Sequence, residues 1–162
     1  MKRYVPLKDP DSVMSILSSI SFLGGVSDIQ RSKVFRLLET GQFEKGESVS
    51  QHGEEAAHLY IITKGKIDLL LTDNKIAVKK REFAVGDCFG EAAFLAMNND
   101  TASFVAAEKC ELVVLSRHAL NQLRHEDHEL FTTLIMNLAR ELARKLQYTD
   151  YILLQHERER GS

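Results

Sequence analysis

The residues of this chain that invite a chemical interpretation surround the glycine at position 90. Gly90 precedes a short segment that we expect to be helical, with Glu91, Ala92 and Ala93 in its first turn. The first N–H groups of a helix have no partner within the helix, so they can bind a compact anion. The two small alanines leave room for a ligand. Glu91 either accepts a hydrogen bond from that ligand or is an acidic residue favoured by the helix dipole.

The histidine, cysteine and serine residues of this chain do not have the spacing that catalytic or metal-binding sites require. The two histidines of the β-rich region lack metal-site spacing, and the cysteines lack a C-x-x-C spacing. Ser103 has no histidine nearby in sequence that could activate it as a nucleophile. His125 and His128 lie among acidic residues, which is more typical of a solvated helix end than of a metal site. We therefore expect no catalytic residue, metal or cofactor from His52, His58, Cys88, Cys110, Ser103, His125 and His128.

Composition is that of an ordinary globular protein. The chain has 162 residues, of which 44% are hydrophobic and 27% charged, and its formal net charge is -2. This balance argues against a nucleic-acid partner, which needs a basic face.

No apolar run approaches the roughly 18 residues of a membrane span, and the N-terminus lacks a signal-peptide pattern. Two cysteines are too few for a disulfide scaffold, so we expect reduced thiols in a cytoplasmic protein with no membrane partner.

Three parts are expected to position these residues. Residues 1–40 form an N-terminal helical segment, in which residues 11–20 have helical spacing. A capping box of Ser27 and Gln30 begins a second helix there, which Gly41 ends. Residues 41–125 form a β-roll with a short following helix capped by Ser116, and residues 126–160 form a long C-terminal helix.

Short apolar runs recur in the middle part at residues 48–51, 59–63, 67–71, 76–81, 103–107 and 112–116. Polar or glycine-containing turn signals separate them, including one at residues 72–74. Short strands at regular spacing are typical of sandwiches and rolls. The predicted fold is mainly β with flanking helices: a double-stranded β-helix, or jelly-roll, barrel.

The long helix carries apolar residues at steps of three and four, close to a heptad repeat. They are Phe131, Ile135, Leu138, Leu142, Leu146, Thr149 and Leu153. A helix of about 30 residues spans roughly 45 Å, which is too long to lie wholly on a β-roll of this size. This pattern predicts a homodimer through the C-terminal helix. The alternative is a monomer whose helix folds back onto the roll.

Several stretches, in order and at fitting spacings, resemble the cyclic nucleotide-binding domain family of the catabolite-activator and protein kinase A regulatory-subunit type. Residues 86–95 (Gly-Asp-Cys-Phe-Gly-Glu-Ala-Ala-Phe-Leu) resemble its phosphate-binding cassette. Further matches lie at residues 43–47, 51–54, 59–66, 102–107 and 110–117. The resemblance covers about residues 13–155. It implies a β-roll flanked by helices, with a last helix that moves in response to ligand.

The resemblance also implies a ligand, cyclic AMP or cyclic GMP, and a set of ligand-binding positions. Glu91 matches a glutamate that accepts a hydrogen bond from the ribose 2′-hydroxyl, and Thr149 matches a threonine that meets the base edge. Asp150 lies where a serine is usual. We expect it to be a solvated residue, or a polar residue that determines how two helices pair, rather than a ligand contact. The full set is Phe89, Gly90, Glu91, Ala92, Ala93, Asp100, Thr101, Ala102 and Thr149.

The sequence departs from the family at Asp100, where ligand-binding members have an arginine that holds the phosphate oxygens. Loss of such a partner costs about 2–5 kcal/mol. Repulsion between like charges about 5 Å apart adds roughly 3 kcal/mol at an effective dielectric of about 20. Together these effects lower affinity by at least about 10³-fold, whereas a neutral hydrogen bond from Thr101 restores only about 1 kcal/mol. Binding would be rescued only if Asp100 turned outward and Arg140, Arg144 or Lys145 entered.

Transcription factors of this type carry a winged helix-turn-helix after the long helix, and no such module is expected in residues 155–162. A fragment of a longer protein is the alternative interpretation of this ending.

Two functions remain open. The first is a sensor domain that binds cyclic AMP, cyclic GMP or a related small anion and signals through the C-terminal helix. The second is a degenerate, ligand-free domain that serves as a dimerisation or protein-interaction module. Neither function is enzymatic.

Overall fold

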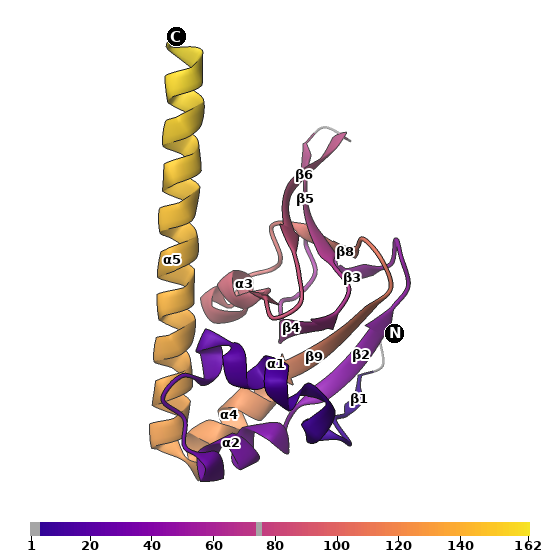
Figure 1. Ribbon diagram of the computed structural model, residues 1–162, viewed down its shortest axis with the longest axis vertical. Helices are drawn as coiled ribbons and strands as arrows, with labels where there is room; N and C mark the ends of the chain where they lie inside the picture. Colours follow the sequence, from indigo (N-terminus) through magenta and orange to yellow (C-terminus); the bar gives the residue numbers. More distant parts are fainter. Residues whose placement is uncertain (1–3, 74–75) are drawn as a thin grey trace.

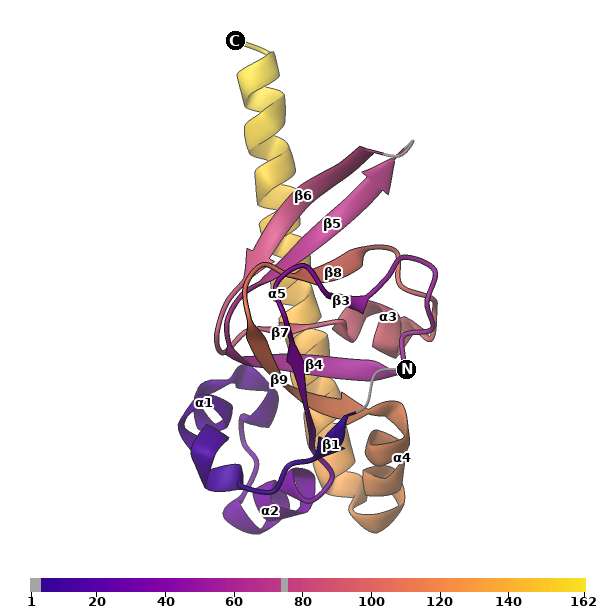
Figure 2. The ribbon, with the colours of Figure 1, turned by 90° about the vertical axis from the view of Figure 1, so that its right-hand side faces the viewer.

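Two antiparallel sheets face each other, and helices cover the outer face of one of them (Figures 1 and 2). The computed structural model describes residues 4–73 and 76–162. The strands are β1 (Val5–Pro6), β2 (Glu39–Phe43), β3 (Ser48–Ser50), β4 (His58–Lys64), β5 (Ile67–Asp73), β6 (Ile76–Phe83), β7 (Cys88–Phe89), β8 (Ser103–Ala106) and β9 (Cys110–Ser116). The turn expected at residues 72–74 lies partly outside the described residues.

The helices lie before, between and after these strands. Their bounds are η1 (Pro10–Val13), α1 (Met14–Ser19), η2 (Ser21–Leu23), α2 (Asp28–Phe35), α3 (Glu91–Ala96), α4 (Arg117–Glu126) and α5 (His128–Arg160). The expected caps are present: Ser27 and Gln30 form a capping box at α2, and the Ser116 hydroxyl accepts a hydrogen bond from the Ala119 N–H group at α4.

The strand order is β1-β2-β9-β4-β7 in one sheet and β3-β8-β5-β6 in the other. All strand pairs are antiparallel. The jelly-roll fold expected from the sequence is confirmed. Over the residues that the structure describes, its strands form two facing sheets rather than a closed barrel.

Strands β4 and β9 are apolar on both faces because they separate two cores. Side chains of a strand point alternately to opposite faces. Leu59 and Ile61 of β4 therefore pack against the helices, in one core, while Tyr60 and Ile62 face the second sheet, in another. Strand β9 repeats this alternation. These two strands form the wall that joins the helical layer to the roll.

The second expected helix is shorter than its prediction. Helix α2 ends at Phe35, and Gly41, which we expected to end it, lies in β2 opposite Leu112. Gly41 is needed there because the ring of Tyr4 covers it. A Cβ atom at position 41 would lie 2.8 Å from Cδ1 of Tyr4. The glycine thus marks a close approach of a ring to the strand, not a helix end.

Helix α5 contacts the body from its start to about Tyr148, and its last turns extend past it (Figure 1). Leu130, Leu134 and Leu138 are buried in the helical core. Further along the helix, Leu146 and Leu153 are 63% and 59% exposed. Of the helices in the described part of the chain, none combines the length and apolarity that crossing a bilayer requires.

Candidate functional site

Within the cassette, the turn from β7 to α3 is made at a glycine that no other residue could replace without strain. Gly90 has φ 83°, in the left-handed region. A Cβ atom there would also lie 3.1 Å from Cδ2 of Tyr60 and 3.3 Å from the carbonyl oxygen of His58. Helix α3 follows, and its far end is fixed by Arg117, whose guanidinium donates to the Phe94 carbonyl oxygen at 2.9 Å. The cassette is therefore held at both ends.

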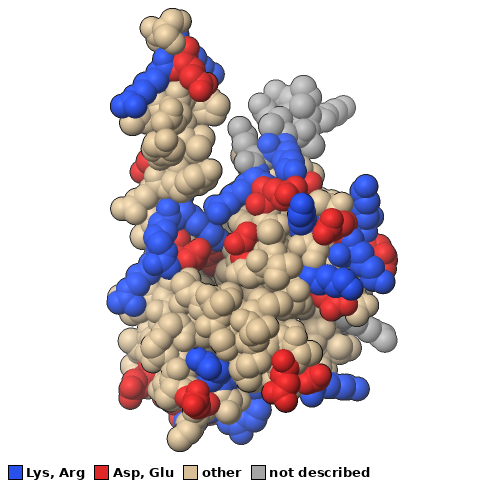
Figure 3. All heavy atoms as spheres, viewed as in Figure 1, with Lys and Arg blue, Asp and Glu red and all other residues tan. Residues whose placement is uncertain are grey.

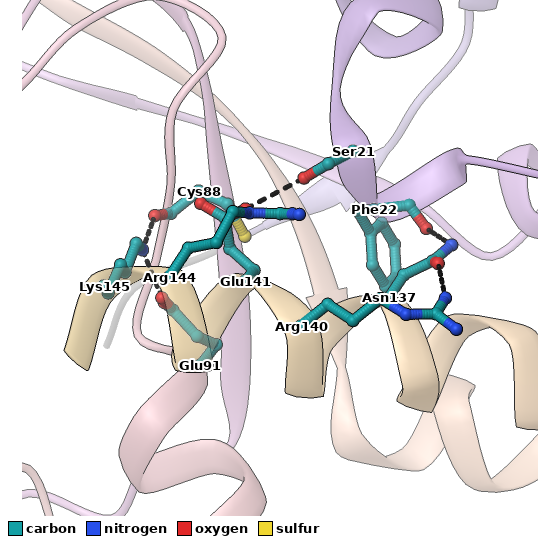
Figure 4. Close-up of polar contacts among 9 residues, drawn as sticks. All are labelled: Ser21, Phe22, Cys88, Glu91, Asn137, Arg140, Glu141, Arg144 and Lys145. Carbon is teal, nitrogen blue, oxygen red and sulfur yellow. Dashed lines mark hydrogen bonds and ion pairs between the residues drawn. The ribbon is translucent and has the colours of Figure 1, made fainter. Parts of the chain in front are cut away.

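Glu91 opens α3 and is 3% exposed. Its carboxylate forms an ion pair with the ammonium group of Lys145, which comes from α5 (Figure 4). The same ammonium group donates to the carbonyl oxygen of Cys88 at 2.7 Å and lies 5.4 Å from the centre of the Phe83 ring. The carboxylate expected to meet a ribose thus already has a partner within the chain.

A second contact joins the roll to α5 one turn further along. The guanidinium carbon of Arg81, in β6, lies 4.9 Å from the centre of the Phe83 ring and 5.6 Å from that of Tyr148. Such placement over aromatic faces is favourable for a guanidinium group. The sequence offered no signal for this contact, because Arg81 and Tyr148 lie far apart in the chain.

The cations named as substitutes for the missing arginine are all engaged elsewhere (Figure 4). Arg144 donates to Glu141 at 2.9 Å, and Arg140 donates to Asn137 at 3.4 Å. Only Lys145 reaches the cassette, and there it meets Glu91. Basic side chains gather on α5 where it passes the body, whereas the free part of the helix is mostly uncharged until its end (Figure 3).

Asp100 faces inward and is 6% exposed. The Ser50 hydroxyl, from β3, donates a hydrogen bond to its carboxylate. The backbone is fixed as well: the Asp100 N–H group donates to the Glu54 carbonyl oxygen, and the Asp100 carbonyl oxygen accepts from the Gly53 N–H group, both at 2.8 Å. The outward orientation that a rescued phosphate site would need is not observed.

Asp100 and Ser50 line a cavity of about 460 Å³ together with Tyr4, His58 and Tyr60. Glu91, Ala92 and Ala93 do not belong to its lining. The two carboxylates have different partners in the structure. Glu91 faces α5, and Asp100 faces this cavity.

The remaining expected ligand residues are spread over core and surface. Phe89 is buried and stacks on Tyr60 with 4.9 Å between ring centres, and Ala102 is also buried. Ala92 and Thr101 are exposed, and Ala93 is half-buried. Thr149 is exposed on α5, where its hydroxyl donates to the Lys145 carbonyl oxygen at 3.0 Å. The polar residues that sequence reasoning missed are Ser50, Tyr4, Tyr60, Arg81 and Tyr148.

A family model described as "Cyclic nucleotide-binding domain" matches residues 40–127. The chain belongs to the cyclic nucleotide-binding domain family. This is a family of regulatory and sensor domains. The resemblance stated from the sequence is thus confirmed.

Curated relatives and solved structures agree with this assignment. A cAMP-dependent protein kinase regulatory subunit from Colletotrichum orbiculare is 30% identical over 107 residues, which are 66% of this chain and 27% of that protein. The chain thus spans about a quarter of that relative's length. A cyclic nucleotide-binding domain from Methylobacillus flagellatus superposes with a TM-score of 0.79 at 21% identity, covering 90% of this chain and 83% of the other.

A further solved neighbour is described as independent of cAMP. The regulatory subunit of a cAMP-independent protein kinase A from Trypanosoma brucei superposes with a TM-score of 0.70 at 25% identity. The match covers 91% of this chain and 50% of that chain. The family fold therefore occurs both in proteins named for cAMP dependence and in one named for its absence.

Proposed function

We propose that this chain is a regulatory domain that keeps the family fold but does not use a cyclic nucleotide phosphate as its signal. It acts as a dimerisation or protein-interaction module through α5, without catalysis. The observation that carries this proposal is the burial of Asp100, where ligand-binding members have arginine. A cyclic phosphate entering there would meet a carboxylate, which disfavours it through like-charge repulsion.

The contacts of α5 support the same conclusion. The family resemblance implies that the last helix moves in response to ligand, so the link between this helix and the cassette matters for signalling. Here Lys145 makes that link directly, to the carboxylate of Glu91 and the carbonyl oxygen of Cys88. The helix is thus held at the cassette by contacts within the chain itself.

Two trypanosomal structures support a phosphate-independent role by analogy. A mutant of the Trypanosoma brucei protein, one of whose substitutions introduces an arginine, is described as bound to cAMP. The counterpart from Trypanosoma cruzi is described as bound to guanosine, which has no phosphate. The mutant therefore links an added arginine to cAMP binding in a domain of this fold. The present chain has Asp100 at the position where ligand-binding members have an arginine.

The exposed apolar residues of α5 support a homodimer in this proposal. Leu146, Tyr151, Leu153 and Leu154 of α5 are each about half exposed or more. A second copy of the helix would cover them. With both cysteines free and buried, we place the protein in the cytoplasm.

Calorimetric titration of the purified chain with cyclic AMP, cyclic GMP and guanosine tests the proposal. A family domain that retains its arginine serves as the positive control. We expect no cyclic nucleotide binding tighter than about 1 mM, given the loss of at least about 10³-fold. Binding of guanosine alone would also agree, because it needs no phosphate site. A cyclic nucleotide dissociation constant in the micromolar range would overturn the proposal in favour of a cyclic nucleotide sensor.

A further inference from the structure

We propose that two copies of this chain pair through α5 in antiparallel orientation, along the face of the helix that points away from the body. The inference rests on the homodimer of the proposed function and names the face and the orientation that form it. Helix α5 runs along one side of the molecule, and the roll and the shorter helices of the described chain lie on its other side (Figures 1 and 2). The outward face is therefore open to a second copy.

The apolar heptad positions expected from the sequence do not all belong to this outward face. Leu138 is buried in the helical core, and Phe131 and Ile135 pack against that core. A second series begins at Glu129, steps by three and then four residues in turn, and ends at Arg160. Every member of this series is exposed. Because such steps keep residues on one side of a helix, the series forms a continuous outward stripe, about 46 Å long.

The charges of the outward stripe decide between the two orientations. In a parallel pair each residue meets its own counterpart, so Glu129, Asp150 and Glu157 would each face a like charge. Like charges that face each other across an interface repel. In an antiparallel pair centred at residues 144–145, Glu129 instead meets Arg160 of the second copy, and two-fold symmetry produces this contact twice. Antiparallel pairing thus replaces repulsion with attraction.

The sizes of the facing side chains fit the same register. Leu146 meets Ala143 of the second copy, and Met136 meets Leu153 of the second copy. A large side chain opposite a small one lets the two helices interdigitate. Met136, Leu146 and Leu153 are 46%, 63% and 59% exposed in a single copy. A second copy would therefore remove apolar surface from water at each of these layers.

The remaining polar positions of the outward stripe also avoid like charges in this register. Asp150 meets Ala139 of the second copy, whose small side chain leaves room for the carboxylate, and the cation Arg140 follows Ala139 in the chain. Glu157 meets Thr132 of the second copy. Across the stripe, all of whose members the structure describes, no two like charges face each other. This charge complementarity favours a second copy as the occupant of the face.

Cysteine cross-linking of the full chain tests the orientation. Thr132→Cys and Glu157→Cys leave the apolar residues of the stripe unchanged, and the two positions lie about 37 Å apart along one helix. With a short bismaleimide, an equimolar mixture of the two variants should form a covalent dimer, whereas neither variant alone should exceed the natural chain. The natural chain is the control for Cys88 and Cys110, which are buried. A covalent dimer from Glu157→Cys alone, or none from a mixture that sediments as a dimer, would overturn the inference.

Charge exchange at the two ends of the stripe tests the register independently. Glu129→Arg places like charges opposite each other twice per dimer, so the dimer dissociation constant from sedimentation equilibrium should rise at least about threefold. Glu129→Arg/Arg160→Glu exchanges the two charges and should return the constant to within about twofold of the natural value. Glu108→Arg makes the same charge change at an exposed position between β8 and β9 and should leave the constant unchanged. A Glu129→Arg dimer as tight as the natural one, or a double variant no tighter than the single variant, would contradict the register.

The failure of this inference and the failure of the proposed function are distinguishable. A natural chain that sediments as a monomer would overturn the homodimer and the antiparallel pairing together. A dimer that cross-links through Glu157→Cys alone would overturn the antiparallel pairing and leave the homodimer standing.

Discussion

The ammonium group of Lys145 lies between the carboxylate of Glu91 and the carbonyl oxygen of Cys88, and so joins α5 to the first turn of the cassette helix. The two side chains are 18% and 4% exposed, so the pair is largely removed from water. A carboxylate buried to this extent needs a partner. Lys145, which lies 54 positions away in sequence, is that partner.

Lys145→Met should destabilise the protein by about 3 kcal/mol, because it leaves the Glu91 carboxylate buried without a cation. Urea unfolding followed by circular dichroism measures the loss. The double variant Glu91→Gln/Lys145→Met removes both charges and should recover most of it. If the double variant instead loses the sum of the two single losses, the two residues are not coupled. Hydrogen exchange along residues 141–148 should also rise in Lys145→Met.

Asp100→Arg should create measurable affinity for cyclic AMP or cyclic GMP, at least about 100-fold tighter than that of the natural chain. The variant replaces a repelling carboxylate with a charge-assisted donor. Asp100→Asn removes the repulsion without adding a donor and should gain less. Titration calorimetry measures all three. A well-folded Asp100→Arg variant with no gain would mean that the phosphate site is lost at more than this position.

Asn137→Ala should destabilise the chain by about 2–3 kcal/mol. The Asn137 amide, buried on α5, donates to the carbonyl oxygens of Phe22 and Gly24, both at 2.8 Å. Its removal leaves two acceptors of the N-terminal segment unsatisfied. Gln147→Ala, an exposed amide on the same helix, is the control and should change stability by less than about 0.5 kcal/mol. Equal losses in the two variants would contradict a fastening role for Asn137.

Asp127 links stability to pH at the start of α5. Hydrogen bonds from Lys33 at 2.8 Å and from the Leu130 N–H group at 3.0 Å hold the pKa of Asp127 below its ordinary value. The unfolded chain therefore takes up this proton at higher pH than the folded chain. Its stabilising contribution is complete above the unfolded pKa and is lost as pH falls through the folded pKa.

Asp127→Asn keeps a good helix cap but cannot titrate. Between about pH 5 and pH 2, the natural chain should therefore lose more stability than the variant. Urea midpoints at constant ionic strength give both slopes. Parallel slopes would show that Asp127 has the same pKa in the folded and unfolded states.

If two copies pair through α5 as proposed, Leu146→Glu/Leu153→Glu should convert the dimer to a monomer, because both side chains are exposed on this helix. Charged residues in an apolar helix seam disfavour pairing. Sedimentation equilibrium measures the mass. Gln147→Glu/Gln155→Glu adds the same charge away from the heptad positions and should remain dimeric. A natural chain that sediments as a monomer at high concentration would refute the dimer.

The fold was predictable where strands and helices have their own sequence signals. Apolar runs between glycine turns located six strands, and β4 and β9 stand out because each is apolar on both faces. The predicted long helix begins two residues later than expected, at His128. Strand β2 was missed because Gly41 looks like a helix end, although it serves the ring of Tyr4. Strand β7 has only two residues and no period to detect.

The site was predictable only as a set of positions. Glu91 and Asp100 could be selected from the sequence, but not their partners. Ser50 is 50 residues from Asp100, and Tyr4 is 56 residues from Tyr60. Such pairs depend on how β3, β4 and the N-terminus meet in space. The sequence therefore named both carboxylates, but it could not show that Glu91 pairs with Lys145 or that Asp100 accepts a hydrogen bond from Ser50.

The position of Lys145 near the middle of α5 has a mechanical consequence. The helix continues from this residue to Arg160, a length of about 22 Å. If the rod pivots at Lys145, a tilt of about 10° moves its far end by roughly 4 Å. A tilt about this point would thus be largest at the tip, where a partner protein could distinguish the two positions.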